Sequence, residues 1–186
     1  MIGYALCGSF CTFNSSYEAI QILKKTYTNI LPIMSYNAYN TDTRFGKSNE
    51  WREKITGLCQ RDIVCTITDA EPLGPKITLD ALIIAPCTGN TLAKLANGIT
   101  DTPVCMAAKA HLRSDRPLII ALASNDAMSA NLSNLAKLLT RKNVYFVPML
   151  QDEPNKKPHS LVADFSLITE TLENAIIGKQ LRKLFL

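Results

Sequence analysis

Two short stretches of small and hydroxyl-bearing residues have the composition of anion-binding turns. The first is Gly8–Thr12, which follows an apolar run and precedes a segment with helical spacing. The second is Pro86–Thr91, which has the same kind of neighbours. A turn of this kind at the start of a helix offers free backbone N–H groups, hydroxyl groups and the positive end of the helix dipole. The first stretch could therefore hold a phosphate group, and in the second Thr88 and Asn90 supply hydroxyl and amide groups at the start of a helix.

Neither stretch is one of the familiar nucleotide-binding loops. Gly8–Thr12 lacks the Gly-Lys-Ser/Thr ending of the P-loop, and it is not the three-glycine dinucleotide fingerprint. In the second stretch Pro86 is expected to stop a strand, and Asn90 is expected to cap the helix over Asn90–Asn97. The thiol of Cys87 precedes this helix, and we expect it to be a compact apolar group rather than a nucleophile.

The elements that position these stretches alternate along the chain between apolar runs and amphipathic segments. Strands are expected over Ile2–Cys7, Ile30–Met34, Ile63–Ile67, Leu79–Ala85, Leu118–Ala123 and Val144–Val147. Helices are expected over Ser15–Thr28, Glu50–Cys59, Asn90–Asn97, Val104–Leu112 and Ala127–Arg141. A loop is expected over Pro148–Ser160. A last amphipathic helix is expected after it, with Leu161, Phe165, Ile168, Leu172 and Ala175 on one face.

This alternation predicts the α/β class, with one domain over residues 1–186. The expected architecture is a three-layer, doubly wound parallel sheet of the Rossmann-like or flavodoxin-like kind. In such a sheet, ligands bind beyond the carboxyl ends of the strands, where the strand order reverses. The candidate positions therefore follow Cys7, Met34, Ala85 and Ala123.

Composition restricts the class of partner. The formal net charge is +4 and the basic residues are scattered, which argues against a nucleic-acid groove and suits a pocket for a small acidic molecule. The six cysteines lack metal-ligand spacing, so we expect reduced thiols and no metal site. No apolar run is long enough for a membrane span and no signal peptide is recognisable, so we expect a cytoplasmic protein that does not bind membranes.

The string Pro86–Thr91, with Ala93–Gly98 after it, resembles the Pro-Ala-Ser-Ala-Asn-Thr motif of the homo-oligomeric flavin-containing cysteine decarboxylase family. That family also places a Gly-Ser turn after its first strand, as Gly8-Ser9 does here. The resemblance implies the doubly wound fold, FMN as the cofactor and a homo-oligomer built on trimers. It implies that Gly8, Ser9 and Phe10 contact the phosphate and ribityl region of FMN and that Ser35 is a further phosphate or ribityl contact. It implies that Thr88, Asn90 and Thr91 line the flavin and the active site, with Pro86 and Ser124 as further cofactor contacts.

Further strings resemble one branch of this family, in which the flavoprotein is one of the two components of a synthase of spore-forming bacteria. These strings include Asn40–Gly46, Asp69–Lys76, Met106–Ala110, Ser124–Ala127, Gln151-Asp152 and Lys156–Pro158. The resemblance implies conversion of a hydroxylated tetrahydrodipicolinate to dipicolinate in the mother-cell cytoplasm. It also implies a partner protein that resembles a nicotinamide-dependent dehydrogenase.

The residues that would act on such a substrate follow from its chemistry. A small dicarboxylate is complemented by cations, so Arg44, Lys76 and Lys109 are the candidate substrate contacts. Asn90 and Asp126 are the candidate catalytic residues, and Glu71 is a second candidate for proton transfer.

Two other functions stay open at this point. One is FMN-dependent decarboxylation of a cysteinyl substrate, as in the wider family, which places a catalytic histidine near the third strand. The two histidines of this chain, His111 and His159, lie elsewhere, and we expect both at the surface or in loops. The other is a non-catalytic scaffold for the dehydrogenase-like partner.

Overall fold

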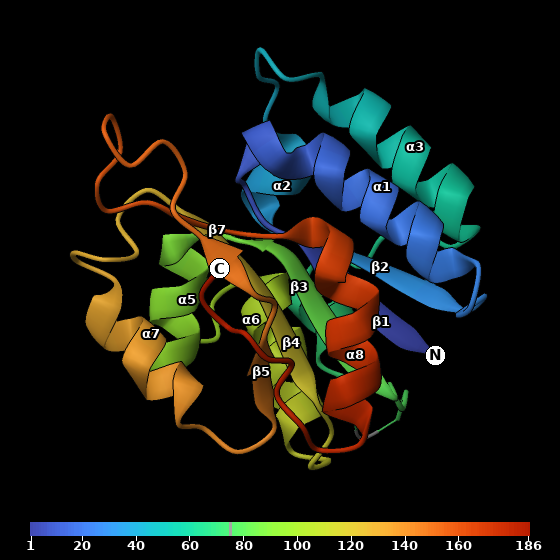
Figure 1. The fold of residues 1–186 in the computed structure, drawn as a ribbon. Helices are drawn as coiled ribbons and strands as arrows, with labels where there is room; N and C mark the ends of the chain where they lie inside the picture. Colours follow the sequence, from blue (N-terminus) through green and yellow to red (C-terminus); the bar gives the residue numbers. More distant parts are fainter. Residues whose placement is uncertain (75) are drawn as a thin grey trace.

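The computed structural model describes residues 1–74 and 76–186, so Pro75 of the string Asp69–Lys76 lies outside the described residues. The described residues form a seven-stranded sheet between two layers of helices (Figure 1). Its five parallel strands lie in the order β2-β1-β3-β4-β5, with β1 (Ile2–Leu6), β2 (Ile30–Met34), β3 (Ala81–Cys87), β4 (Leu118–Ser124) and β5 (Val144–Phe146). The predicted single-sheet α/β architecture is confirmed.

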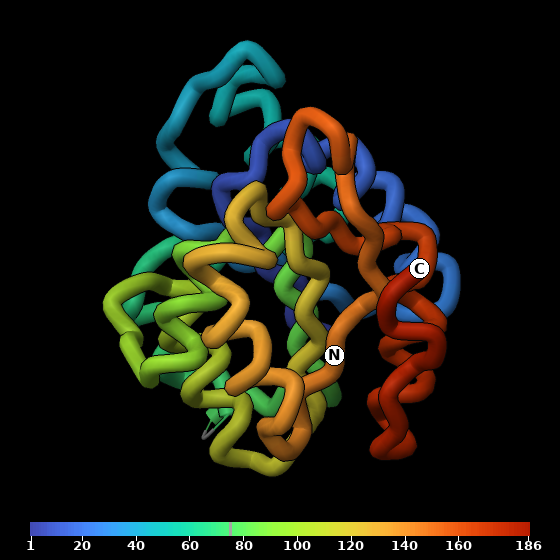
Figure 2. Tube along the Cα trace, turned by 60° about the vertical axis from the view of Figure 1, so that its left-hand side comes forward, coloured from blue at the N-terminus to red at the C-terminus, as the bar shows by residue number. Residues whose placement is uncertain are grey.

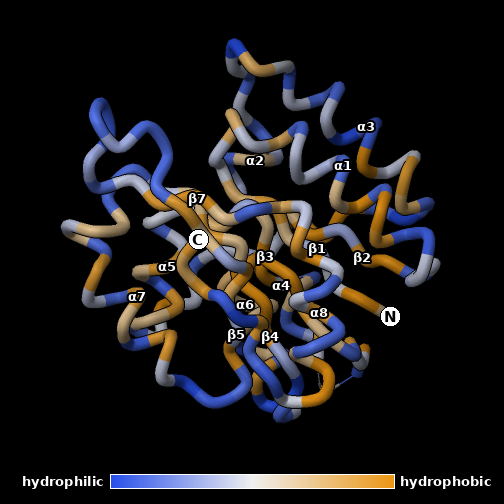
Figure 3. The backbone as a smooth tube through the Cα atoms, viewed as in Figure 1, coloured by the Kyte–Doolittle hydropathy of each residue, from blue (hydrophilic) through white to orange (hydrophobic). Residues whose placement is uncertain are grey.

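Helices cover both faces of the sheet because its strands are apolar on both sides. Every residue of β1, β3 and β4 is buried, and these strands form the hydrophobic centre of the molecule (Figure 3). One buried cluster joins the sheet to α1 (Phe13–Lys24), α3 (Ser48–Cys59) and α8 (Ile168–Ile176). The cluster on the other face includes α4 (Ile67–Ala70), α5 (Gly89–Ala96), α6 (Pro103–Leu112) and α7 (Leu132–Leu139).

Two predicted elements are wrong. The strand expected over Ile63–Ile67 is reduced to one bridge between Val64 and Ile33, because the Thr66 side chain accepts a hydrogen bond from the Asp69 N–H and starts α4. The last helix does not begin at Leu161. Residues Leu161–Ala163 are instead β7, which pairs antiparallel with the end of β4 and with β6 (Met149–Leu150).

Several predicted boundaries also differ, and two of these differences lie near the carboxyl edge of the sheet. Pro86 does not stop its strand, because β3 continues to Cys87 through an irregularity in register after Ile84. The helix expected over Ala127–Arg141 begins only at Leu132. The preceding residues form turns, in which the Asp126 carbonyl accepts hydrogen bonds from the N–H groups of Ser129 and Asn131.

The strand order reverses between β1 and β3, and both strands end at the same edge of the sheet. The segment Gln151–Ser160, between β6 and β7, extends over this edge beside the turn that follows β1 (Figure 2). The C-terminal residues return to β6, where the Met149 N–H donates to the Leu184 carbonyl.

Among the described residues, we find no helix with the length and apolar character to cross a membrane.

Candidate functional site

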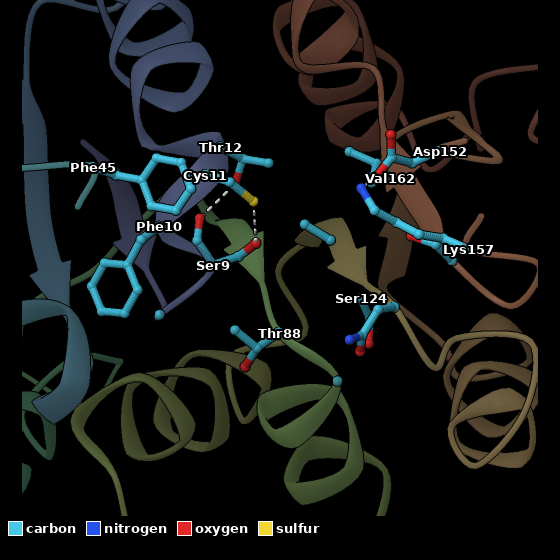
Figure 4. A pocket seen from close by; sticks show the side chains of 15 residues that line it. Ser9, Phe10, Cys11, Thr12, Phe45, Thr88, Ser124, Asp152, Lys157 and Val162 are labelled. Atoms are coloured by element: carbon cyan, nitrogen blue, oxygen red, sulfur yellow. Dashed lines mark hydrogen bonds and ion pairs between the residues drawn. The ribbon is translucent and has the colours of Figure 1, made fainter. Parts of the chain in front are cut away.

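A cleft of about 500 Å³ opens at the carboxyl edge of the sheet, and we call it the aromatic lobe. Segments from distant parts of the chain line it: Gly8–Thr12, Phe45, Thr88-Gly89, Ala123–Asn125, and Asp152, Lys157, Ser160 and Val162. The rings of Phe10 and Phe45 lie on one side, opposite Lys157 and Ser124 (Figure 4). This lobe therefore offers flat apolar surfaces facing a few polar groups.

A second cavity of about 370 Å³, the polar lobe, lies on the other side of the same turns. Its lining is mostly hydroxyl, amide and charged groups, from Ser35, Tyr36, Asn37, Asn90, Thr91, Lys94, Asp101 and Thr102. Gly8 and Thr88 line both cavities. Because these two residues follow β1 and β3, the two lobes meet where the strand order reverses.

Helix capping shapes the polar lobe. The cap of α5 is Thr88 rather than the predicted Asn90, because the Thr88 hydroxyl accepts a hydrogen bond from the Thr91 N–H at 3.2 Å. The Thr91 hydroxyl in turn donates to the Cys7 sulfur at 3.3 Å, which ties α5 to the end of β1. The first-turn N–H groups of α5 lack helical partners and give this end of the helix a partial positive charge.

Two buried thiols lie beside these turns. Burial raises the pKa of Cys7 to about 12 and raises the pKa of Cys87 well above its ordinary value. Both groups are therefore neutral, which agrees with the expectation for Cys87. Cys11, by contrast, is exposed and lines the aromatic lobe.

The predicted cofactor residues gather at these two cavities, with one exception. Gly8, Ser9, Phe10, Thr88 and Ser124 line the aromatic lobe, and Gly8, Ser35, Thr88, Asn90 and Thr91 line the polar lobe. Pro86 is buried inside β3 and lines neither.

Asp126, a predicted catalytic residue, lies behind the wall of the aromatic lobe rather than in it. Its carboxylate accepts hydrogen bonds from the Ser124 hydroxyl and from Asn131 Nδ2, the latter at 2.9 Å. Neither lobe is lined by Asp126. Within this chain, the Asp126 carboxylate binds and orients the hydroxyl of Ser124.

The predicted substrate cations are not brought together. Arg44 lies over the Phe45 ring, 4.8 Å from its centroid, next to the aromatic lobe. Lys109 lines a separate cavity of about 310 Å³ with Arg113 and Arg141. Lys76 and the alternative acid Glu71 are exposed in the segment before the amino end of β3, away from both lobes.

The cation that does line the aromatic lobe, Lys157, was not among the predicted site residues. Its ammonium donates to the Asp152 carboxylate at 2.7 Å, and this bond raises the pKa of Lys157. The strings Gln151-Asp152 and Lys156–Pro158 carried a family resemblance, but the sequence showed them only as parts of a loop. Their place over the cleft depends on β6 and β7, which are too short to produce a periodic pattern in the sequence.

Neither histidine lines the two lobes. His111 is fully buried in α6, contrary to the expectation of a surface position, and its Nε2–H donates to the Pro117 carbonyl at 2.9 Å. Burial lowers the pKa of His111. His159 is exposed.

Comparisons with known proteins show the family of the chain. Residues 2–166 match the model of the family described as Flavoprotein. The chain is 44% identical over 181 residues to the B subunit of dipicolinate synthase from Bacillus subtilis (strain 168), covering 97% of this chain and 90% of the relative. Among solved structures, the B subunit of dipicolinate synthase from Bacillus halodurans C has a TM-score of 0.88 and 39% identity, covering 100% of this chain and 95% of that one.

A more distant neighbour, the FMN-dependent cysteine decarboxylase SpaF, has a TM-score of 0.70 and 24% identity over 94% of this chain and 95% of that one, and it shows the shared fold. The chain belongs to the flavoprotein family and, within it, to the same group as the B subunit of dipicolinate synthase.

Proposed function

We propose that this chain binds FMN across the two lobes and acts as the flavoprotein component of a dipicolinate synthase, which converts a hydroxy-tetrahydrodipicolinate to dipicolinate during sporulation. The supporting observation is that the two lobes meet at Gly8 and Thr88, at the reversal point of the sheet. The 44% identity to the B subunit of the Bacillus subtilis enzyme supports the choice of reaction.

The lining residues fit FMN in both lobes. In the polar lobe, the hydroxyls of Ser35 and Thr91, the amide of Asn37 and the first turn of α5 suit a phosphate and a ribityl chain. In the aromatic lobe, Phe10 and Phe45 suit a flat ring system. The two lobes thus match the two chemically different halves of one cofactor.

The reaction requires loss of one water molecule and removal of two electrons and two protons to make the ring aromatic. Bound FMN would supply a two-electron acceptor at this site. The residues of the chain bind and orient the substrate, and the apolar walls of the aromatic lobe exclude water.

We also propose a trimer-based homo-oligomer in the mother-cell cytoplasm. Its partner would be the A subunit of dipicolinate synthase, which is a dehydrogenase-like protein that passes the electrons to a nicotinamide.

The first test is an absorbance spectrum of the purified protein, with mass spectrometry of anything released by denaturation. We expect a flavin spectrum and released FMN, or uptake of added FMN by the apoprotein. A colourless protein that takes up no FMN would contradict the cofactor assignment.

Activity distinguishes the remaining functions. The two proteins together should form dipicolinate from the hydroxylated precursor, and the partner alone should be slower. A partner that reaches the full rate alone would make this chain a scaffold. Release of carbon dioxide from a cysteinyl peptide would point to decarboxylation, which no histidine of the two lobes supports.

Lys157 is the residue that we assign to a substrate carboxylate. Its ammonium has three donor protons and uses one on Asp152, so donors remain for a ligand in the aromatic lobe. We expect Lys157→Met to raise KM for the dicarboxylate by about tenfold, since a hydrogen bond to a charged group is lost. The matched control is Lys156→Met, which removes an exposed neighbouring cation that lines neither lobe. Equal effects of the two variants would contradict the assignment.

A further inference from the structure

A network of polar side chains runs from the wall of the aromatic lobe to the surface of α7. We call it the asparagine network, and its members are Ser124, Asp126, Asn131, Asn134, Asn97 and Lys137. Asn131 is 6% exposed and Ser124 is 9% exposed, so the inner end of the network is shielded from water. The outer members Asn97 and Lys137 are exposed, and a polar network holds its members in place when each of them is satisfied.

The hydrogen bonds of this network all point in one direction, toward Asp126. Asn131 Nδ2 donates to the Asp126 carboxylate at 2.9 Å, and Asn134 Nδ2 donates to Asn131 Oδ1 at 2.9 Å. At the outer end, Asn97 Nδ2 donates to Asn134 Oδ1 at 3.2 Å, and the Lys137 ammonium donates to Asn97 Oδ1 at 3.0 Å.

Chemistry at the two ends fixes this direction. The carboxylate of Asp126 can only accept, and the ammonium of Lys137 can only donate. Each amide between them must therefore turn its NH2 group toward Asp126 and its oxygen toward Lys137. No amide can be reversed without placing two donors or two acceptors against each other.

The consequence for the cleft lies at Ser124. Its hydroxyl proton is given to Asp126, so only the lone pairs of its oxygen are left for the aromatic lobe. Gly89 permits this packing, because a Cβ at that position would lie 2.5 Å from Ser124 Oγ and 2.7 Å from Asp126 Oδ1.

We propose that the asparagine network holds Ser124 as a hydrogen-bond acceptor, so that this wall of the cleft selects an N–H group on the flavin ring. Ser124 contacts the ligand, and Asp126 and Asn131 are positioning residues. This inference rests on the proposed FMN site. The oxidised flavin ring carries an N–H at N3, and the reduced ring carries another at N5, so either edge presents the required donor.

The test reverses the polarity of Ser124 with the isosteric variant Asp126→Asn. The new side chain keeps its oxygen toward Asn131 and turns its NH2 group to Ser124, which directs the serine proton into the cleft. We expect FMN to bind about tenfold more weakly, measured by fluorescence quenching on titration of the apoprotein. Lys142→Met is the matched control, because Lys142 pairs with Asp115 at the surface outside the network, and it should bind FMN like the wild type.

Two further measurements strengthen the test. Ser124→Ala removes the acceptor without creating a donor, so its loss of affinity should be smaller than that of Asp126→Asn. Repeating the titrations with dithionite-reduced FMN locates the donor: a larger loss in the reduced form supports N5, and an equal loss supports N3. Undiminished binding of both redox forms by a folded Asp126→Asn protein would overturn the inference.

Failure of the FMN site itself gives a different result. If the wild type binds no FMN, the proposed function fails, and the network is then tested in the apoprotein by NMR of side-chain amides. Asp126→Asn should shift the signals of Asn131, Asn134 and Asn97 and leave that of Asn90 unchanged. Unchanged signals throughout the network would overturn the inference independently of the cofactor.

Discussion

At the scale of single residues, Gly89 decides whether three parts of the chain can meet at the cleft. A Cβ at this position would lie 2.5 Å from Ser124 Oγ and 2.6 Å from Asn131 Nδ2. We expect Gly89→Ala to lower the free energy of unfolding by about 2 kcal/mol, because buried polar groups would have to separate. The urea midpoint measures this loss.

Gly57 provides the control for this substitution. It lies within α3, and an added Cβ would meet no atom within 4 Å. Gly57→Ala should therefore raise the free energy of unfolding by about 0.5–1 kcal/mol, through reduced freedom of the unfolded chain. Stabilisation of both variants would show that the wall around Ser124 yields easily.

His111 makes stability depend on pH. Its pKa is lowered by burial, and no partner for its Nδ1 is found among the described residues. The unfolded chain therefore binds a proton more readily than the folded one. Stability is fully present above the ordinary histidine pKa of about 6.5 and is lost as the pH falls below it.

The expected slope is at most about 1.4 kcal/mol per pH unit for this one group. Urea denaturation at pH 7.0, 6.0 and 5.5 measures it. His111→Gln keeps a side-chain donor for the Pro117 carbonyl but does not titrate, so its stability should be flatter across the same interval. Parallel curves for the two proteins would show that His111 is not the titrating group.

The sequence located the residues of the site that follow a central strand directly. Gly8, Ser9 and Thr88 were predictable because the end of a buried strand is a local signal. The charge of Lys109 and Lys76, and the strings around them, predict substrate contacts but do not encode the distance of these residues from the cleft. The sequence does not predict the positions of Lys157 and Asn131. Lys157 is placed by the pairing of β7 with β4, and Asn131 by its hydrogen bond to Asp126, and neither contact produces a periodic pattern in the sequence.

At the scale of elements, two similar helix caps distinguish the effect of a cap on protein stability from its effect on FMN binding. The hydroxyls of Thr88 and Thr66 cap α5 and α4 with similar bonds to backbone N–H groups, at 3.2 Å and 3.1 Å. Thr88→Ala and Thr66→Ala should each lower the free energy of unfolding by about 1 kcal/mol. Only Thr88 lines the two lobes, so only Thr88→Ala should also weaken FMN binding. Equal affinities in both variants would remove Thr88 from the cofactor site.

Element prediction worked where apolar runs were long and failed where elements were short. The strand Ile30–Met34 has the predicted bounds, and all of its residues are buried. β6 and β7 have two and three residues, which are too few to show a period. The residues of β7 also continue the amphipathic pattern of the last helix, so the sequence does not separate the two elements. The turn at Thr66 overrode the β-branched residues before it, because a side-chain cap fixes a helix start locally.

At the scale of the whole molecule, the proposed cofactor would hold together turns that follow β1, β2, β3 and β4. A ligand that binds only the folded chain stabilises it by about 2.7 kcal/mol at a hundred times its Kd. For a domain of this size, that corresponds to a rise in Tm of about 5–10 °C. Riboflavin lacks the phosphate that we assign to the polar lobe, so at the same concentration it should raise Tm by less than half as much. Equal shifts with FMN and riboflavin would mean that the α5 terminus and Ser35 hold no phosphate, and that only the aromatic lobe recognises the flavin.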